Sequence, residues 1–159
     1  MKIRITMILM AMSLIACQKK QYYTSSPEID LVKKGNEAYI KGDWTALRSL
    51  YADTAKVVIN TWLDQAMTAD KFIETEKAGT AGLSEYKMEN TIMEMVVDDS
   101  GSHWVHTWFL HIAKFKNGKE AKVPVHFTTR VENGMVVFQG FIFDSLPGFL
   151  AAQDSTAGK

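Results

Sequence analysis

The hydrophobic pattern of the chain changes its period near residue 80. Between residues 27 and 79, apolar or small residues recur at spacings of three and four, which is typical of amphipathic helices. Between residues 86 and 144, apolar and polar residues alternate, which is typical of strands with one buried face. Helices followed by strands predict an α+β domain, in which three N-terminal helices pack against a bent antiparallel sheet.

The first two helices have clear boundaries. Ser25 or Ser26 can cap a helix that carries Pro27 in its first turn, and Gly42 ends it. Asp43 can cap the next helix. The predicted inner face of this second helix consists of Trp44, Leu47, Leu50 and Tyr51.

A short strand and a third helix come before the main sheet. Residues 55–60 are rich in valine and isoleucine and predict the strand. Thr68 or Asp70 begins the third helix, which stops near Gly79. Four long strands are then predicted, joined by turns at residues 98–101, at the hairpin signal Asn117-Gly118 and at residues 132–134.

The N-terminal residues have the pattern of an export signal. Lys2 and Arg4 precede a mostly apolar run that ends at Ala16, and Cys17 follows. The four residues that end in Cys17 resemble the lipobox of bacterial lipoproteins, which implies cleavage before Cys17 and lipid on that residue. Gln18 at the next position implies an outer-membrane protein that faces the periplasm. A plain secretory signal is the alternative, because a membrane-spanning helix needs about 20 apolar residues.

Composition supports a single folded domain. We expect a lipoprotein signal peptide at 1–16, a tether at 17–26, the domain at 27–150 and a flexible tail at 151–159. The chain has 18 basic and 18 acidic residues, and removing Lys2 and Arg4 leaves 16 basic ones, a net charge of −2. No basic run occurs, so nucleic acid is not an expected partner. Cys17 is the only cysteine, so the domain must rely on its apolar core rather than on disulfides.

Three segments of the chain resemble the nuclear transport factor 2-like superfamily. They are Gly42–Ala55, Glu132–Val137 and Phe141–Asp144, and the resemblance extends over residues 29–146. This superfamily includes ketosteroid isomerase, SnoaL-type polyketide cyclases and many members without catalysis. The resemblance implies a cone, formed by a sheet that curls around the first helix and leaves a pocket at its wide end. It says little about function, because this fold hosts many activities.

The ketosteroid isomerases supply a template for a site. Their catalytic aspartate aligns with Ile59, eight residues after Tyr51. Their oxyanion-hole positions align with Lys34, near which Tyr39 can supply the phenol, and with His126. Isoleucine cannot accept a proton, so the resemblance implies that this activity is lost and that the protein is not a robust enzyme.

By the same analogy, the strand face that carries His126 lines the pocket. The expected ligand-binding residues are Lys34, Tyr39, Ile59, His106, Trp108, Leu110, Ile112, His126, Thr128, Arg130, Phe141 and Phe143. Such a pocket suits a flat or apolar molecule with an acidic or carbonyl group. His126 is the candidate general acid or base, since imidazole titrates near neutral pH. The alternative is that both histidines are hydrogen-bonded structural residues and that the aromatic residues form core.

No metal or other cofactor is expected. His103 and His111 project from the opposite strand face and lie eight residues apart on one strand, about 26 Å, too far to share an ion. His106 and His126 can share a face, but no acidic residue supplies an obvious third ligand beside them.

The other face of the sheet should be exposed in a monomer, yet its predicted residues are apolar. They include Val105, Phe109, Phe127, Phe138 and Ile142. An exposed apolar face needs a cover, so we expect a homodimer through this surface. The alternative cover is the C-terminal segment Leu146–Leu150, folded back over the sheet.

The sequence therefore predicts a lipid-anchored cell-envelope domain that binds a small, partly apolar molecule in a cone pocket. Two alternatives remain open. One is an isomerase or cyclase that uses His126 as acid or base. The other is a protein-interaction module that uses the outer sheet face around a filled cone.

Overall fold

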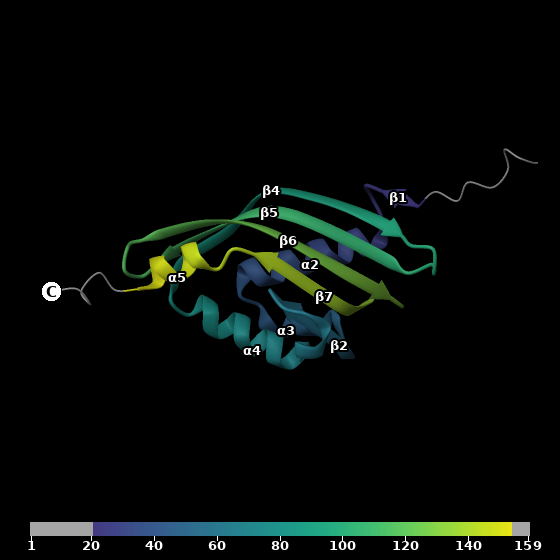
Figure 1. Cartoon of the computed structure of the whole chain (residues 1–159), viewed down its shortest axis with the longest axis horizontal. Coiled ribbons are helices and arrows are strands. Elements are labelled where there is room, and N and C mark those ends of the chain that lie inside the picture. The colour runs from purple at the N-terminus through teal and green to yellow at the C-terminus, as the bar shows by residue number, and fades with distance from the viewer. Residues whose placement is uncertain (1–20, 154–159) are drawn as a thin grey trace, which may run out of the picture.

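The computed structural model describes residues 21–153. Its seven-stranded sheet has the order β1-β4-β5-β6-β7-β2-β3 and arches over the helices (Figure 1). The helical elements are α2 (Pro27–Lys41), α3 (Trp44–Ser49), the 3₁₀ turn η1 (Leu63–Gln65), α4 (Ala69–Thr80) and α5 (Leu146–Ala152). The strands are β1 (Tyr22–Tyr23), β2 (Tyr51–Ile59), β3 (Met67–Thr68), β4 (Leu83–Val97), β5 (His103–Phe115), β6 (Glu120–Glu132) and β7 (Met135–Phe143). This arrangement confirms the predicted fold class.

The helix boundaries follow from the predicted capping residues. The Ser26 hydroxyl accepts a hydrogen bond from the Ile29 amide at 3.2 Å, which begins α2. Gly42 ends α2 in the left-handed region at φ 65°, where glycine is strain-free. The Asp43 carboxylate caps α3 by accepting from the Ala46 amide at 2.9 Å.

The first long strand differs from its prediction. Tyr51 was expected on the inner face of the second helix, but it begins β2, which runs parallel to β7. Tyr51 is buried in β2, so a side chain that was assigned to a helix face belongs to a strand face, next to Ala55 of the predicted strand. A strand pairing between distant segments outweighs local propensity here.

The curvature of the sheet has a local cause in β4. Asn90 adopts a left-handed conformation at φ 54°, and the β4–β5 register shifts between Glu89 and Ile92. Such a bulge bends a strand and increases its twist. The bend lets β4, β5 and β6 curl around α2 (Figure 1).

The faces of β5 and β6 are inverted relative to the prediction. Phe127 pairs with Phe141 and Val125 with Phe143, so these four residues face the cone interior together. The analogy had placed His126 on that face. Within β6 every odd-numbered residue from Ala121 to Val131 is buried, and burial decides the face of a strand.

The predicted outer face is corrected accordingly. Val105, Phe109 and Phe127 were expected outside but are buried in the core. Phe138 and Ile142 do lie on the outer face of β7, because an irregularity between Arg130 and Val131 shifts the register there. The face of β7 was therefore predicted correctly, while those of β5 and β6 were not.

Both ends of the domain extend beyond the predicted bounds. Tyr22 and Tyr23 fall in the expected tether but pair as β1 with Val96 and Met95 of β4. At the other end α5 continues to Ala152, inside the expected tail. The expected signal peptide and Cys17 lie outside the described residues.

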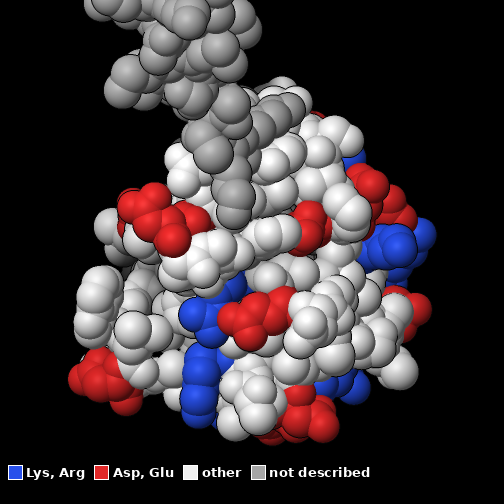
Figure 2. Space-filling view, turned by 90° about the vertical axis from the view of Figure 1, so that its right-hand side faces the viewer, with Lys and Arg blue, Asp and Glu red and all other residues white. Residues whose placement is uncertain are grey.

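The surface at the β1 end carries charges of both signs. Figure 2 views this end, and acidic and basic side chains are interspersed on it. Within residues 21–153, no helix is long and apolar enough to cross a membrane.

Candidate functional site

The cone encloses a cavity of about 430 Å³ between the concave face of the sheet and the helices. Its walls come from α2, α3, α4 and the inner faces of β5, β6 and β7. Most of the lining is apolar and much of it aromatic, including Leu31, Leu47, Phe72, Val125, Phe127 and Phe141. A cavity of this size and character is typical of a small-molecule site.

Helix α5 closes part of the mouth. Gly148, Phe149 and Ala152 line the cavity from this helix. The Asn117 side chain holds α5 to the β5–β6 hairpin, because its amide donates to the Ala151 carbonyl at 2.9 Å. The C-terminal segment thus folds back over the inner side of the sheet, not over the outer face as the alternative required.

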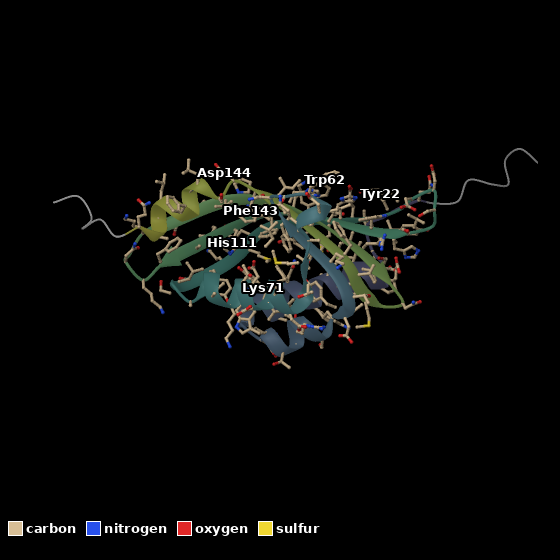
Figure 3. All side chains as sticks on the ribbon, turned by 60° about the horizontal axis from the view of Figure 1, so that its bottom comes forward. Tyr22, Trp62, Lys71, His111, Phe143 and Asp144 are labelled. Carbon is tan, nitrogen blue, oxygen red and sulfur yellow. The ribbon has the colours of Figure 1, made fainter. Side chains whose placement is uncertain are left out.

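A polar cluster interrupts the apolar wall on the helical side. The Tyr39 phenol on α2 lies close to the Glu76 carboxylate on α4 and lowers its pKa as a hydrogen-bond donor. The Tyr39 ring lies 6.2 Å from the His111 ring on β5, centroid to centroid. All three residues line the cavity. In Figure 3, His111, Phe143 and Asp144 lie toward the α5 end of the sheet.

Removal from water changes the protonation of this cluster. Burial raises the pKa of Glu76 to about 7, and the hydrogen bond from Tyr39 opposes that rise. Burial lowers the pKa of His111, so its imidazole is neutral at pH 7. The Nε2 atom of His111 is buried and has no hydrogen-bond partner among the described residues. Such an unsatisfied atom is a candidate contact for a ligand.

A second polar group lies deeper in the cone. The Tyr51 phenol donates to the side-chain oxygen of Gln139, and the Gln139 amide donates to the Thr129 hydroxyl at 3.0 Å. All three residues are buried and line the cavity. These three side chains satisfy one another's hydrogen bonds, so the hydrogen-bonded group fixes the shape of this part of the cavity.

The structure brings together only some of the predicted site residues. Tyr39, Ile59, Phe141 and Phe143 line the cavity as expected. Lys34 is exposed on α2. The remaining seven project from the opposite side of the sheet, namely His106, Trp108, Leu110, Ile112, His126, Thr128 and Arg130.

Sequence reasoning missed Glu76 and His111 as cavity residues. Glu76 lies four residues after the buried Phe72, so the helical period places both on one face of α4. His111 lies two residues after the buried Phe109, so strand alternation places both on one face. These two spacings in the sequence could have placed Glu76 and His111 on the inner side of the domain.

The outer histidines form an aromatic stack on the sheet surface. His126 stacks on Trp108 with ring centroids 4.8 Å apart and on His106 at 5.7 Å. Burial lowers the pKa of His126, and the neighbouring His106 lowers it further. A second pocket of about 420 Å³ borders this stack and is lined by His126, Trp62, Arg130 and Phe138.

Among residues 21–153, no group of three or more histidine, cysteine, aspartate or glutamate side chains is placed to hold a metal ion. The cavity lining carries acid–base and hydrogen-bonding groups, among them Glu76, His111 and Gln139.

Solved structures with the same fold include several bacterial proteins. A candidate polyketide cyclase from Xanthomonas campestris is 13% identical, with a TM-score of 0.66 over 80% of this chain and 97% of that one. A candidate SnoaL-like polyketide cyclase from Shewanella putrefaciens is 16% identical, with a TM-score of 0.63 over 80% and 96%. An NTF2-like protein of unknown function from Burkholderia pseudomallei is 15% identical, with a TM-score of 0.64 over 82% and 100%.

No family model and no curated protein sequence matches this chain. The structural likeness shows that the chain has the nuclear transport factor 2-like fold. The predicted resemblance is thereby confirmed at the level of the fold.

Proposed function

We propose that the cone cavity binds a small, largely apolar molecule that carries one or two polar groups. The observation that supports this most is the cavity of about 430 Å³, whose aromatic walls are interrupted by the Glu76, Tyr39 and His111 cluster. Side chains that merely packed a core would fill this space, because protein interiors are close-packed. An open, polar-tipped cone favours ligand binding over the interaction module with a filled cone.

Filling the cavity tests this function. Replacing Val125 with tryptophan should place an indole in the cavity and abolish binding of the uncharged fluorescent probe N-phenyl-1-naphthylamine. Leu110→Trp is the matched control, since Leu110 lies on the other face of the same sheet and should leave binding intact. The fluorescence of the probe measures its binding to each of the two variants. Equal binding by the two variants, with both folded by circular dichroism, would rule the cavity out as the binding site.

A second candidate function is proton transfer of the isomerase or cyclase kind. It is favoured by one observation, the Glu76 carboxyl whose pKa is raised to about 7 within the cavity. Glu76 would remove a proton from carbon beside a substrate carbonyl, in place of the expected His126, which faces outward. Deuterium exchange into 2-tetralone tests it: loss of exchange in His126→Ala but not in Glu76→Gln contradicts this assignment.

The outer sheet face supports a homodimer in which Ile142 takes part as predicted, while Val105, Phe109 and Phe127 are buried in the core. Ile92, Trp108, His126 and Ile142 lie in register across four strands. Ile92, Trp108 and Ile142 are 63%, 38% and 69% exposed, which leaves an apolar row open to water. Glu94 lies on the β4 side of this face, and Lys56 and Arg130 lie toward β2. A second copy turned about an axis along the strands would bring these opposite charges together.

A charge in the row tests the dimer. Trp108→Glu should convert a dimer to a monomer in light scattering, because a buried carboxylate without a partner is costly. Ile40→Glu changes an exposed apolar residue on α2 and should leave the dimer intact. A wild-type protein that scatters as a monomer at micromolar concentration contradicts the dimer.

The lipid anchor on Cys17 stays a proposal, because that residue lies outside the described part of the chain. Its support is the sequence pattern at residues 1–17. β1 and α5 lie at opposite ends of the domain (Figure 1), so an anchor before Gln21 would be joined to the end away from α5, which lines the cavity. Incorporation of labelled palmitate into the wild type and equally into Cys17→Ser would exclude the anchor.

A further inference from the structure

We propose that the cavity selects a cationic ligand, an apolar primary amine whose ammonium group pairs with the Glu76 carboxylate. This inference rests on the proposed function, since it requires that the cavity binds small molecules. It goes further by naming the charge and the chemical class of the ligand.

The ionisable groups of the cavity favour a positive charge. Its lining contains two carboxylates, Glu76 inside and Asp144 at the mouth, and no lysine or arginine. His111 adds no positive charge at neutral pH, because burial lowers the pKa of its imidazole. A carboxylate or phosphate ligand would therefore enter a cavity that offers it only negative or neutral groups.

Glu76, which is half-buried, lacks the partner that a carboxylate partly removed from water normally has. It forms no ion pair with any lysine, arginine or histidine in residues 21–153; Glu74, on the same helix, pairs with Lys71 at 2.8 Å. Besides burial, the group that affects the pKa of Glu76 is the neutral phenol of Tyr39. Charged groups that are removed from water are usually paired, so an unpaired carboxylate on a cavity wall is suited to a cation from outside.

Aromatic residues share the cavity wall with this carboxylate, among them Phe72 and Tyr39. Phe72 precedes Glu76 by one turn of α4, and the Tyr39 ring packs against the rings of Tyr86 at 5.3 Å and Trp44 at 5.9 Å. Aromatic faces attract ammonium groups through the ring quadrupole, more strongly in a desolvated site. A carboxylate among such rings supplies both attractions that hold an apolar amine.

Binding of an ammonium group must be coupled to a proton. The titratable side chains that Glu76 acts on are Tyr39 from α2, Tyr51 from β2 and Tyr86 from β4, each of which has a raised pKa and is neutral at pH 7. His111 from β5 lines the same cavity and is also neutral at that pH, because burial lowers its pKa. Burial raises the pKa of Glu76 to about 7. Below that pH the carboxyl must lose its proton before it pairs with an amine, so affinity falls by up to about tenfold per pH unit.

The experiment compares three eight-carbon ligands that differ only in the head group. Octylamine, 1-octanol and octanoate each displace N-phenyl-1-naphthylamine from the full chain at pH 8. We expect octylamine to bind at least tenfold more tightly than 1-octanol, and octanoate to bind most weakly. In Glu76→Gln the octylamine-to-octanol ratio should fall to about one. Glu74→Gln removes an exposed carboxylate from the same helix and should keep the wild-type ratio.

A pH series adds a readout that a structural defect would not mimic. The octylamine preference of the wild type should shrink as the pH falls from 8 to 5, while the amine itself stays protonated, since alkylammonium groups titrate near 10.4. Two results would overturn the inference: an octylamine-to-octanol affinity ratio near one in the wild type, or a preference for octylamine that does not change with pH and persists in Glu76→Gln. In either case, binding of 1-octanol would still support the proposed function. If N-phenyl-1-naphthylamine does not bind at all, both the amine selectivity and the proposed small-molecule binding are overturned.

Discussion

Glu76→Gln is expected to raise the free energy of unfolding at pH 8 by about 2–3 kcal/mol and to leave it nearly unchanged at pH 4. In the folded protein, burial raises the pKa of Glu76 from its ordinary value of 4.5 to about 7. Between these two values the folded state holds a proton that the unfolded state has released. Stability from this group is therefore full at low pH and is lost as the pH rises toward 7. Glutamine mimics the protonated carboxyl and removes the loss.

Urea unfolding of the two proteins at pH 4, 6 and 8 measures this effect. The difference between them should grow from near zero at pH 4 to its full size at pH 8. Glu74→Gln serves as the control, because Glu74 is exposed and should show no such gain. A wild type and a Glu76 variant with parallel pH profiles would contradict the desolvated position of Glu76. A gain in stability on replacing Glu76 would fit a role in ligand binding, because residues that serve a binding site often lower the stability of the fold.

Phe127→Ala is expected to lower the free energy of unfolding by about 3–5 kcal/mol, whereas His126→Ala should cost less than about 1 kcal/mol. Phe127 is 2% exposed and packs against Phe109 at 6.0 Å and Phe141 at 5.2 Å between ring centroids. Truncating it removes buried apolar surface and leaves a void beside the cavity. His126 lies half-buried on the other face of the same strand.

Denaturant unfolding of this neighbouring pair tests which face of β6 points inward. The ordering of the two losses matters more than their size, since the two residues share one strand and one backbone environment. A larger loss for His126→Ala than for Phe127→Ala would restore the face assignment that the analogy with ketosteroid isomerase implied. It would also return His126 to the list of pocket candidates.

The local features of the fold were predictable because their signals are local. Ser26, Gly42 and Asp43 terminate helices by hydrogen bonds or backbone conformations that involve only adjacent residues. The turn at Asn117-Gly118 forms as predicted, with Gly118 at φ 84°. The resemblance to the nuclear transport factor 2-like fold followed from short segments of this kind.

The site was harder to predict because it depends on which strand face points inward. One residue of register exchanges every side chain between the two faces, and the family spacing counted back from Gly134 selected His126, whose neighbours Val125 and Phe127 are the buried residues. The uninterrupted alternation from Ala121 to Val131 was the better guide, since it places valine and alanine inside and lysine outside. The parallel pairing of β2 with β7 joins distant segments and has no local signal.

Nuclear Overhauser contacts between N-phenyl-1-naphthylamine and methyl groups of the protein test the central claim most directly. Binding inside the cone predicts contacts from the probe to methyl groups of Leu47 and Val125, which line the cavity. It predicts no contacts to Ile92 and Ile142, which are exposed on the outer face. Contacts to Ile92 and Ile142 without any to Leu47 and Val125 would contradict the account and move the ligand site to the outer face of the sheet.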